Sequence, residues 1–148
     1  MAIELRKEVI SYITEGTVID HIPPGEALTI IRLLNLDNYQ KRLSIGINLP
    51  STSYGLKDLI KIEEKELEEK EVNQVALFAP DATISIIRDR KVHLKFQVIL
   101  PEKIEGCFKC PNAHCITNHE RVTHVFTLSE RGQKIFFCCK YCRKTFTH

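Results

Sequence analysis

Four cysteines in the last third of the chain constrain its fold more than any other feature. They are spaced Cys110-x4-Cys115 and Cys139-x2-Cys142, so two short knuckles separated by 23 residues can converge on one metal. Zinc prefers four soft donors in a tetrahedron, and a site closed by four thiolates leaves no coordination position for water or substrate. The spacing therefore predicts a structural zinc centre rather than a catalytic one.

Cys107 makes a second ligand set possible. Cys107-x2-Cys110 is also a metal knuckle, and it would pair with Cys139-x2-Cys142 as a plain zinc ribbon. Spacing alone leaves both sets open. A set of disulfides is the third interpretation, and it requires an oxidising compartment. The first ten residues lack the basic region and apolar stretch of a secretion signal, and no run approaches the roughly 18 apolar residues of a membrane span. We therefore expect a soluble, cytoplasmic protein with reduced thiols and no membrane partner.

The charge distribution separates two regions of the 148-residue chain. Residues 1–100 carry 13 Lys and Arg against 15 Asp and Glu, whereas residues 101–148 carry 8 against 4. Pro101 follows the last apolar alternation. We therefore expect two domains, residues 1–100 and 101–148. About 48 residues bury little surface alone, so the metal must supply much of the folding free energy of the second domain.

Hydrophobic periodicity predicts an α+β first domain. Alternating residues indicate strands and the i, i+3, i+4 stripes indicate helices. The expected order is extended chain over 9–13 and again over 17–22, helix 27–34, strand 43–49 ending at Pro50, strand 57–62, helix 72–79 and hairpin 83–87 with 92–98. An acidic run, residues 63–71, is expected to be a solvated surface stretch before the second helix. The order β-α-β-β-α-β with an extra strand predicts helices on one face of an antiparallel sheet. In the tail, residues 123–128 and 134–137 are expected to form short strands.

No catalytic motif is present in the sequence: there is no phosphate-binding glycine loop, no nucleophile elbow and no His-Glu-x-x-His. His21 beside Asp20 is a poor general-base pair, because adjacent strand residues point to opposite faces. Lys57 and Lys61 share a strand face about 13 Å apart, so they are either ordinary surface lysines or a grip for an extended polyphosphate. The basic tail with its phenylalanines leaves a zinc-ribbon nucleic-acid-binding protein as the alternative function.

Several stretches together resemble a known family. The first domain contains Gly16-Thr-Val-Ile-Asp-His-Ile-Pro23, Ile45-Gly-Ile-Asn-Leu-Pro-Ser51 and Lys57-Asp-Leu-Ile-Lys-Ile-Glu63. The tail adds Cys110-Pro-Asn-Ala-His-Cys115-Ile and Cys139-Lys-Tyr-Cys142. These residues closely resemble the regulatory chains of aspartate carbamoyltransferase, the committed enzyme of pyrimidine synthesis, and the resemblance covers nearly the whole chain.

The resemblance implies a non-catalytic subunit with no nucleic-acid partner. Such a chain links catalytic trimers through homodimers made by its N-terminal domain, and it binds CTP and ATP as effectors, with UTP as a further candidate. The implied fold is a ferredoxin-like α/β sandwich followed by a small all-β zinc domain that docks on the catalytic chain. The family pattern selects the ligands of one structural Zn²⁺ and leaves Cys107 and Cys138 as spare thiols; the ligands are Cys110, Cys115, Cys139 and Cys142.

The resemblance also implies an effector site in the first domain. Asp20 would lie near the ribose or base, Lys95 on the phosphates, and Lys57 and Lys61 around the ribose and phosphates. His21 would help to place the phosphates. Apolar walls and main-chain contacts to the base would come from Ile10, Tyr12, Ile13, Val18, Ile87 and Val92.

Three positions depart from the family pattern. Ser11 stands where an acidic residue is frequent, Ser85 where an asparagine is frequent, and Arg90 where an aromatic residue is frequent. Ser11 and Ser85 are still expected to line the effector site. The departures bear on effector preference rather than on binding itself.

Overall fold

The computed structural model describes residues 12–52, 55–132 and 134–147. The chain divides into two compact units, Met1–Ile99 and Leu100–His148. Ile10 and Ser11, expected to lie in the effector site, fall outside the described residues. No helix within the described ranges is long and apolar enough to cross a membrane.

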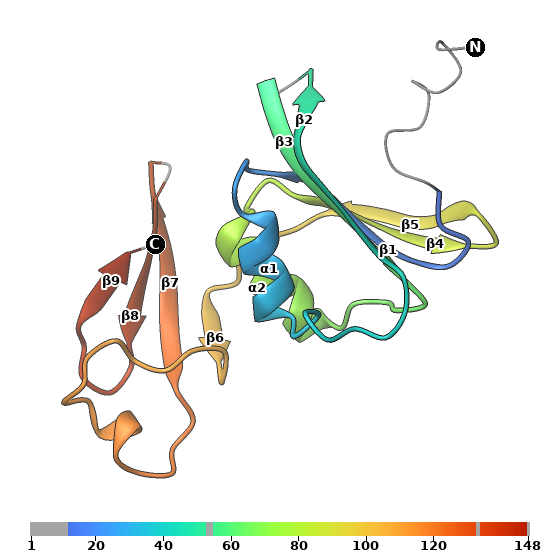
Figure 1. The fold of residues 1–148 in the computed structure, drawn as a ribbon. Helices are drawn as coiled ribbons and strands as arrows, with labels where there is room; N and C mark the ends of the chain where they lie inside the picture. Colours follow the sequence, from blue (N-terminus) through green and yellow to red (C-terminus); the bar gives the residue numbers. More distant parts are fainter. Residues whose placement is uncertain (1–11, 53–54, 133, 148) are drawn as a thin grey trace, which may run out of the picture. The chain divides into compact units, whose positions relative to one another are not determined.

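The first unit is an α+β domain in which helices cover one face of a five-stranded antiparallel sheet (Figure 1). The strands lie in the order β2-β3-β1-β4-β5. The first six elements have the ferredoxin-like order and β5 extends the sheet beside β4, which confirms the expected fold. Their bounds are β1 Gly16–Ile22, α1 Ala27–Leu33, β2 Leu43–Ser51, β3 Gly55–Glu63, α2 Glu69–Phe78, β4 Thr83–Arg88 and β5 Lys91–Gln97.

The core of this unit lies between the sheet and the helices. Ile19, Ile60 and Ile84 from three neighbouring strands are fully buried, as are Ile30 of α1 and Val75 of α2. Along β3, buried residues alternate with partly exposed ones. The sequence predicts this alternation, and among the described residues both helices, α1 and α2, lie on the same face of the sheet, so that the opposite face carries no helix (Figure 1). We call it the open face.

The predicted end of β2 at Pro50 is wrong. The strand continues to Ser51, and Pro50 pairs with Leu56 of β3. Proline cannot donate a ladder hydrogen bond, but β2 is an edge strand, so no further strand needs that donor.

Gly16 allows β1 to begin close to β3. Its φ is +139°, and a Cβ at this position would lie only 1.9 Å from the carbonyl oxygen of Ile62. Only glycine accommodates both the backbone conformation and the approach.

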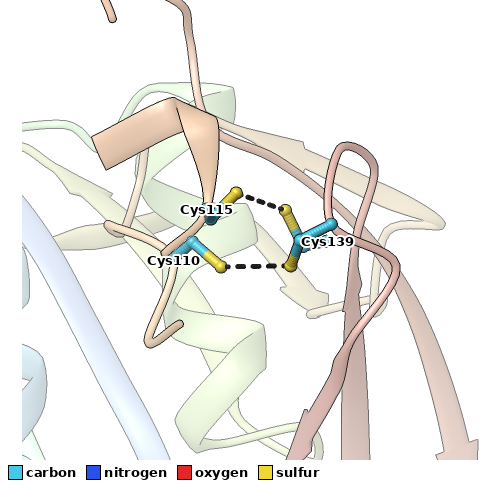
Figure 2. A group of neighbouring side chains, drawn as sticks. Cys110, Cys115 and Cys139 are labelled. Atoms are coloured by element: carbon cyan, nitrogen blue, oxygen red, sulfur yellow. Dashed lines mark hydrogen bonds between the residues drawn. The ribbon is translucent and has the colours of Figure 1, made fainter. Parts of the chain in front are cut away.

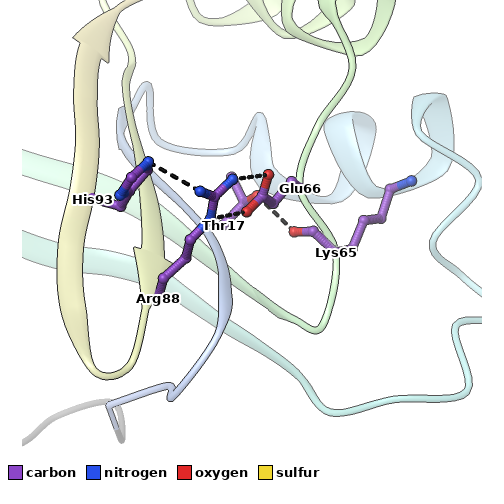
Figure 3. A network of polar contacts seen from close by, with 5 residues as sticks. All are labelled: Thr17, Lys65, Glu66, Arg88 and His93. Carbon is purple, nitrogen blue, oxygen red and sulfur yellow. Dashed lines mark hydrogen bonds and ion pairs between the residues drawn. The ribbon is translucent and has the colours of Figure 1, made fainter.

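The acidic run before α2 is anchored as well as solvated (Figure 3). The buried Thr17 hydroxyl donates to the Lys65 carbonyl at 2.7 Å. Glu66 accepts two hydrogen bonds from the Arg88 guanidinium, at 2.7 and 3.0 Å, which lower the pKa of Glu66. Arg88 also lies 3.0 Å from the ring of His93 on β5. The connector between β3 and α2 is therefore tied directly to β1 and β4, and through Arg88 to β5.

The second unit is built on a four-stranded antiparallel sheet, in the order β6-β7-β8-β9. Phe126 is almost fully buried and packs edge-on against Phe137 at 5.5 Å between ring centroids. The two longer strands are those expected from the sequence, whereas the three-residue strands β6 and β9 are too short for an alternation signal. The elements are β6 Lys103–Glu105, the 3-10 turn η2 Ile116–Asn118, β7 Val125–Arg131, β8 Lys134–Cys139 and β9 Thr145–Thr147.

Candidate metal centre and effector surface

Two loops of the second unit bring four cysteines together. Cys110 and Cys115 lie in the connection from β6 to β7, Cys139 ends β8, and Cys142 follows in the next turn. All four sulfur atoms lie within 4.8 Å of one another. The Cys115 and Cys139 sulfurs, which face each other in Figure 2, are 3.7 Å apart, as are those of Cys110 and Cys142.

These distances suit a tetrahedral metal. Four thiolates about 2.3 Å from one zinc ion lie about 3.8 Å from each other, whereas a disulfide requires about 2.0 Å. Three of the four cysteines are buried, and the donor set is all sulfur, which favours zinc over hard cations. The cluster fits one structural zinc ion.

The first cysteine knuckle is held by hydrogen bonds from residues that follow it. The Asn118 side-chain amide donates to the carbonyls of Cys110 at 2.9 Å and of Asn112 at 2.8 Å. The Cys110 amide donates to Nδ1 of His124 at 3.2 Å. The ligand loop is thus shaped by side chains beyond the cysteines themselves, as in many metal sites.

The thiols have unequal acidities. Burial raises the pKa of Cys110 to about 12. Burial also acts to raise the pKa of Cys142, but hydrogen bonds from the Lys144 amide and the Asn112 side chain outweigh it and lower that pKa to about 6. Burial therefore opposes the thiolate form of Cys110. A bound zinc ion supplies the positive charge that deprotonates the four thiols together.

The remaining two cysteines lie outside this cluster. The Cys107 thiol donates to the Glu105 carbonyl at 3.6 Å, and the Cys138 thiol donates to the Arg143 carbonyl at 3.6 Å. The geometry groups the set chosen by the family pattern rather than the Cys107-x2-Cys110 ribbon.

On the first unit, the open face brings predicted effector residues into one row. Val18 on β1 is the direct partner of Lys61 on β3 and of Ser85 on β4, and Ser85 is the partner of Lys95 on β5. Adjacent strands are about 4.8 Å apart, so the two lysines end a row about 14 Å long. Next to it, Ile87 pairs with the exposed Val92.

Asp20 and Lys57 form an ion pair beside this row. Lys57 Nζ lies 2.8 Å from Oδ1 and 3.1 Å from Oδ2 of Asp20. Partial burial of Asp20 acts to raise its pKa, but the hydrogen bonds from Lys57 and from the His21 amide outweigh burial and hold the pKa below its usual value. Asp20 therefore stays ionised at neutral pH.

Of three other predicted residues, Tyr12 and His21 contact residues of the sheet, whereas Ile13 belongs to the core. Tyr12 is 73% exposed, and Lys61 Nζ lies 5.2 Å from the centroid of its ring. Ile13, in contrast, is buried. His21 has a φ of 58° at a break in the β1–β3 register, and its Nδ1 lies 3.2 Å from the Thr83 hydroxyl. The strand alternation used in the sequence analysis therefore does not apply to His21.

The sequence analysis missed the role of Asp58. This carboxylate is fully buried and accepts hydrogen bonds from the amides of Gly25, Ala27 and Asn48 at 3.0 to 3.2 Å. It links the start of α1 to β2. Asp58 follows Lys57 on β3, and its side chain lies on the buried side of the strand. A signal was present, because an aspartate on the buried side of an alternating strand requires partners.

Fold and site together define a two-domain type of chain: an open α/β sandwich with a lysine at each end of one row, and a small β-domain whose four cysteines fit a structural metal. Sequence comparison specifies the class. The family model described as "Aspartate carbamoyltransferase regulatory chain, allosteric domain" matches residues 8–99, and the one described as the metal binding domain of the same chain matches residues 102–148.

Named relatives agree with the family models. The aspartate carbamoyltransferase regulatory chain of Aeromonas hydrophila is 46% identical over 138 residues, covering 93% of this chain and 90% of its own length. That of Methanopyrus kandleri is 47% identical over 138 residues, covering 92% and 88%. That of Tolumonas auensis is 43% identical over 144 residues, covering 97% and 94%. The chain belongs to the aspartate carbamoyltransferase regulatory chain family. It is a regulatory subunit with an allosteric and a metal-binding domain, which favours that function over nucleic-acid binding.

Proposed function

We propose that the open face of the first unit binds nucleoside triphosphate effectors, with CTP and ATP competing for one site and UTP as a further candidate. The observation that carries this proposal is the row from Lys61 through Val18 and Ser85 to Lys95. A cation at each end and small or apolar residues between them suit a ligand with a charged chain and a flat base.

Each part of the face has a chemical role in this proposal. A triphosphate needs several cationic donors, and Lys95 is exposed with no ion pair found for it in the described residues. Asp20, kept ionised by Lys57, is an acceptor for ribose hydroxyls or base amino groups. Val18 and Val92 offer apolar contact to the base and sugar, and His21 and Tyr12 lie at the edge.

We further propose how the two units divide the work. Residues 1–100 bind effectors and pair with a second copy of the chain, whereas residues 101–148 hold one zinc ion through Cys110, Cys115, Cys139 and Cys142. The zinc unit docks on the aspartate carbamoyltransferase catalytic chain, so that regulatory dimers link catalytic trimers in the cytoplasm. The exposed Ile47 and Leu56 on the β2–β3 hairpin support an apolar contact made by the first unit.

Regulation in this scheme is thermodynamic linkage. A nucleotide that binds one quaternary state more tightly than another shifts the equilibrium by its difference in binding free energy. Such couplings are typically about 1–3 kcal/mol.

Calorimetric titration of CTP and ATP into Lys95→Ala tests the effector site. Losing a cationic phosphate contact should weaken triphosphate binding about ten- to a hundredfold, and cytidine or adenosine binding much less. Lys70→Ala, an exposed lysine on α2 and so on the helix side of the sheet, is the matched control. Equal triphosphate affinity in both variants and the parent would remove Lys95 from the site.

A further inference from the structure

Thr117 stands out in the second unit because its side chain is buried against a cysteine. It is the middle residue of η2, two positions after Cys115, and only 3% of it is exposed. Its Oγ1 lies 3.1 Å from the sulfur of Cys115, which is itself 2% exposed. No other hydrogen bond of this hydroxyl is found in the described part of the chain.

The donor in this contact depends on the metal. In a protonated thiol either atom can donate, but a cysteine that binds zinc has lost its proton. The sulfur is then only an acceptor, so the Thr117 hydroxyl must donate. Water does not reach this pair to compete, and a hydrogen bond to a charged acceptor is stronger than one between neutral groups.

We propose that Thr117 is a positioning residue of the zinc centre, whose hydroxyl donates to the Cys115 thiolate and slows release of the metal. This inference rests on the ligand set proposed above and adds a residue to it. The hydrogen bond draws negative charge from the sulfur and so makes it a weaker nucleophile. It also holds the side chain of Cys115 in the ligating orientation.

Other thiols of the cluster have different donors, so the hydroxyl is a feature of Cys115. Cys110 and Cys142 are contacted by the amides of Asn112 and Lys144, each two residues further on. Cys115, in contrast, has the hydroxyl of Thr117 at 3.1 Å from its sulfur. Asn118, which clamps the carbonyls of the knuckle, keeps η2 in place beneath the sulfur.

Two variants of the full chain separate a hydrogen-bonding role from a packing role. Thr117→Val keeps the shape of the side chain and removes the donor, whereas Thr117→Ser keeps the donor and removes a methyl group. Thr127→Val, at an exposed threonine of β7 in the same unit, is the control. The zinc-loaded proteins are mixed with an organic mercurial, and zinc release is followed with a metallochromic dye.

We expect Thr117→Val to release zinc about tenfold faster than the parent, with Thr117→Ser and Thr127→Val close to the parent. In the cobalt-substituted proteins, the sulfur-to-cobalt charge-transfer band of Thr117→Val alone should move to lower energy, because its thiolate is more electron-rich. If Thr117→Val fails to retain metal, retention by Thr117→Ser still supports the donor role.

Equal release rates for Thr117→Val and the parent would overturn the inference. So would equal losses in the Val and Ser variants, because packing would then be the cause. Total zinc per chain, measured on the parent and on Cys115→Ser, shows separately whether the proposed ligand set holds.

Discussion

At the residue scale, the open face is organised by one ion pair. Lys57 holds Asp20 in its charged form, and the His21 amide adds a hydrogen bond of 2.6 Å to the same carboxylate. The open face therefore presents a fixed, charged hydrogen-bond acceptor. Lys57 is engaged by Asp20, whereas Lys61 and Lys95 lie at the two ends of the row.

Titration of the Asp20 carboxyl by NMR tests this arrangement. Its pKa should lie below the usual aspartate value, and Lys57→Ala should raise it, since the lysine supplies the largest favourable interaction with the carboxylate. Because the pKa is lower in the folded chain, the stabilisation is present above the unfolded pKa of about 3.9 and is lost as pH falls through the folded value. An Asp20 pKa unchanged by Lys57→Ala would contradict the role given to the pair.

At the element scale, hydrophobic periodicity predicted the strands in which buried residues alternate with partly exposed ones. Ile19, Ile60 and Ile84 alternate with partly exposed residues, so β1, β3 and β4 could be read from the sequence. β6 and β9 could not be read, because three residues are too few to show a period, and both strands are defined by their pairing with β7 and β8. The partners of Asp58 and Asn118 could not be predicted either. Asp58 binds backbone amides and Asn118 binds backbone carbonyls, and these groups come together only in the folded chain.

Asp58 should be the most sensitive polar position of the first unit. Asp58→Ala removes the buried carboxylate that accepts from the amides of Gly25, Ala27 and Asn48, and leaves the buried Ala27 amide without its acceptor, so it should lower the free energy of unfolding by about 3 kcal/mol. Urea unfolding followed by circular dichroism, with zinc present throughout, measures the change. Asp37→Ala, at an exposed aspartate, should stay within about 0.5 kcal/mol of the parent. A loss no larger than that of the control would show that these bonds contribute little.

The zinc unit depends on the metal centre more than on its strands. Cys115→Ser removes a ligand and should release zinc and unfold this unit, because structural zinc contributes roughly 10–16 kcal/mol of apparent binding free energy in small domains. Cys107→Ser should keep one zinc per chain. Metal analysis of both purified variants distinguishes the ligand sets, and loss of zinc from the Cys107 variant alone would favour the ribbon arrangement.

On the scale of the whole molecule, the two units carry separate tasks. Their cores are distinct, one of aliphatic residues between sheet and helices and one of aromatic residues beside a metal. The cysteine spacing predicted the metal centre of the second unit, and the order of strands and helices predicted the α+β architecture of the first. Spacing alone did not predict which four of the six cysteines converge, because Cys107-x2-Cys110 and Cys110-x4-Cys115 are equally compatible with a tetrahedral site. The family pattern was needed to choose between them.

The most direct test of the account is the effector response of the assembled complex. The chain is co-purified with its catalytic chain, and carbamoyltransferase activity is measured against CTP and ATP concentration for the parent, Lys95→Ala and Lys70→Ala. We predict that all three assemble, that the parent and Lys70→Ala respond alike, and that Lys95→Ala needs at least about tenfold more nucleotide for the same response. Identical nucleotide responses from all three complexes, or failure of the parent chain to assemble with the catalytic chain, would contradict the account.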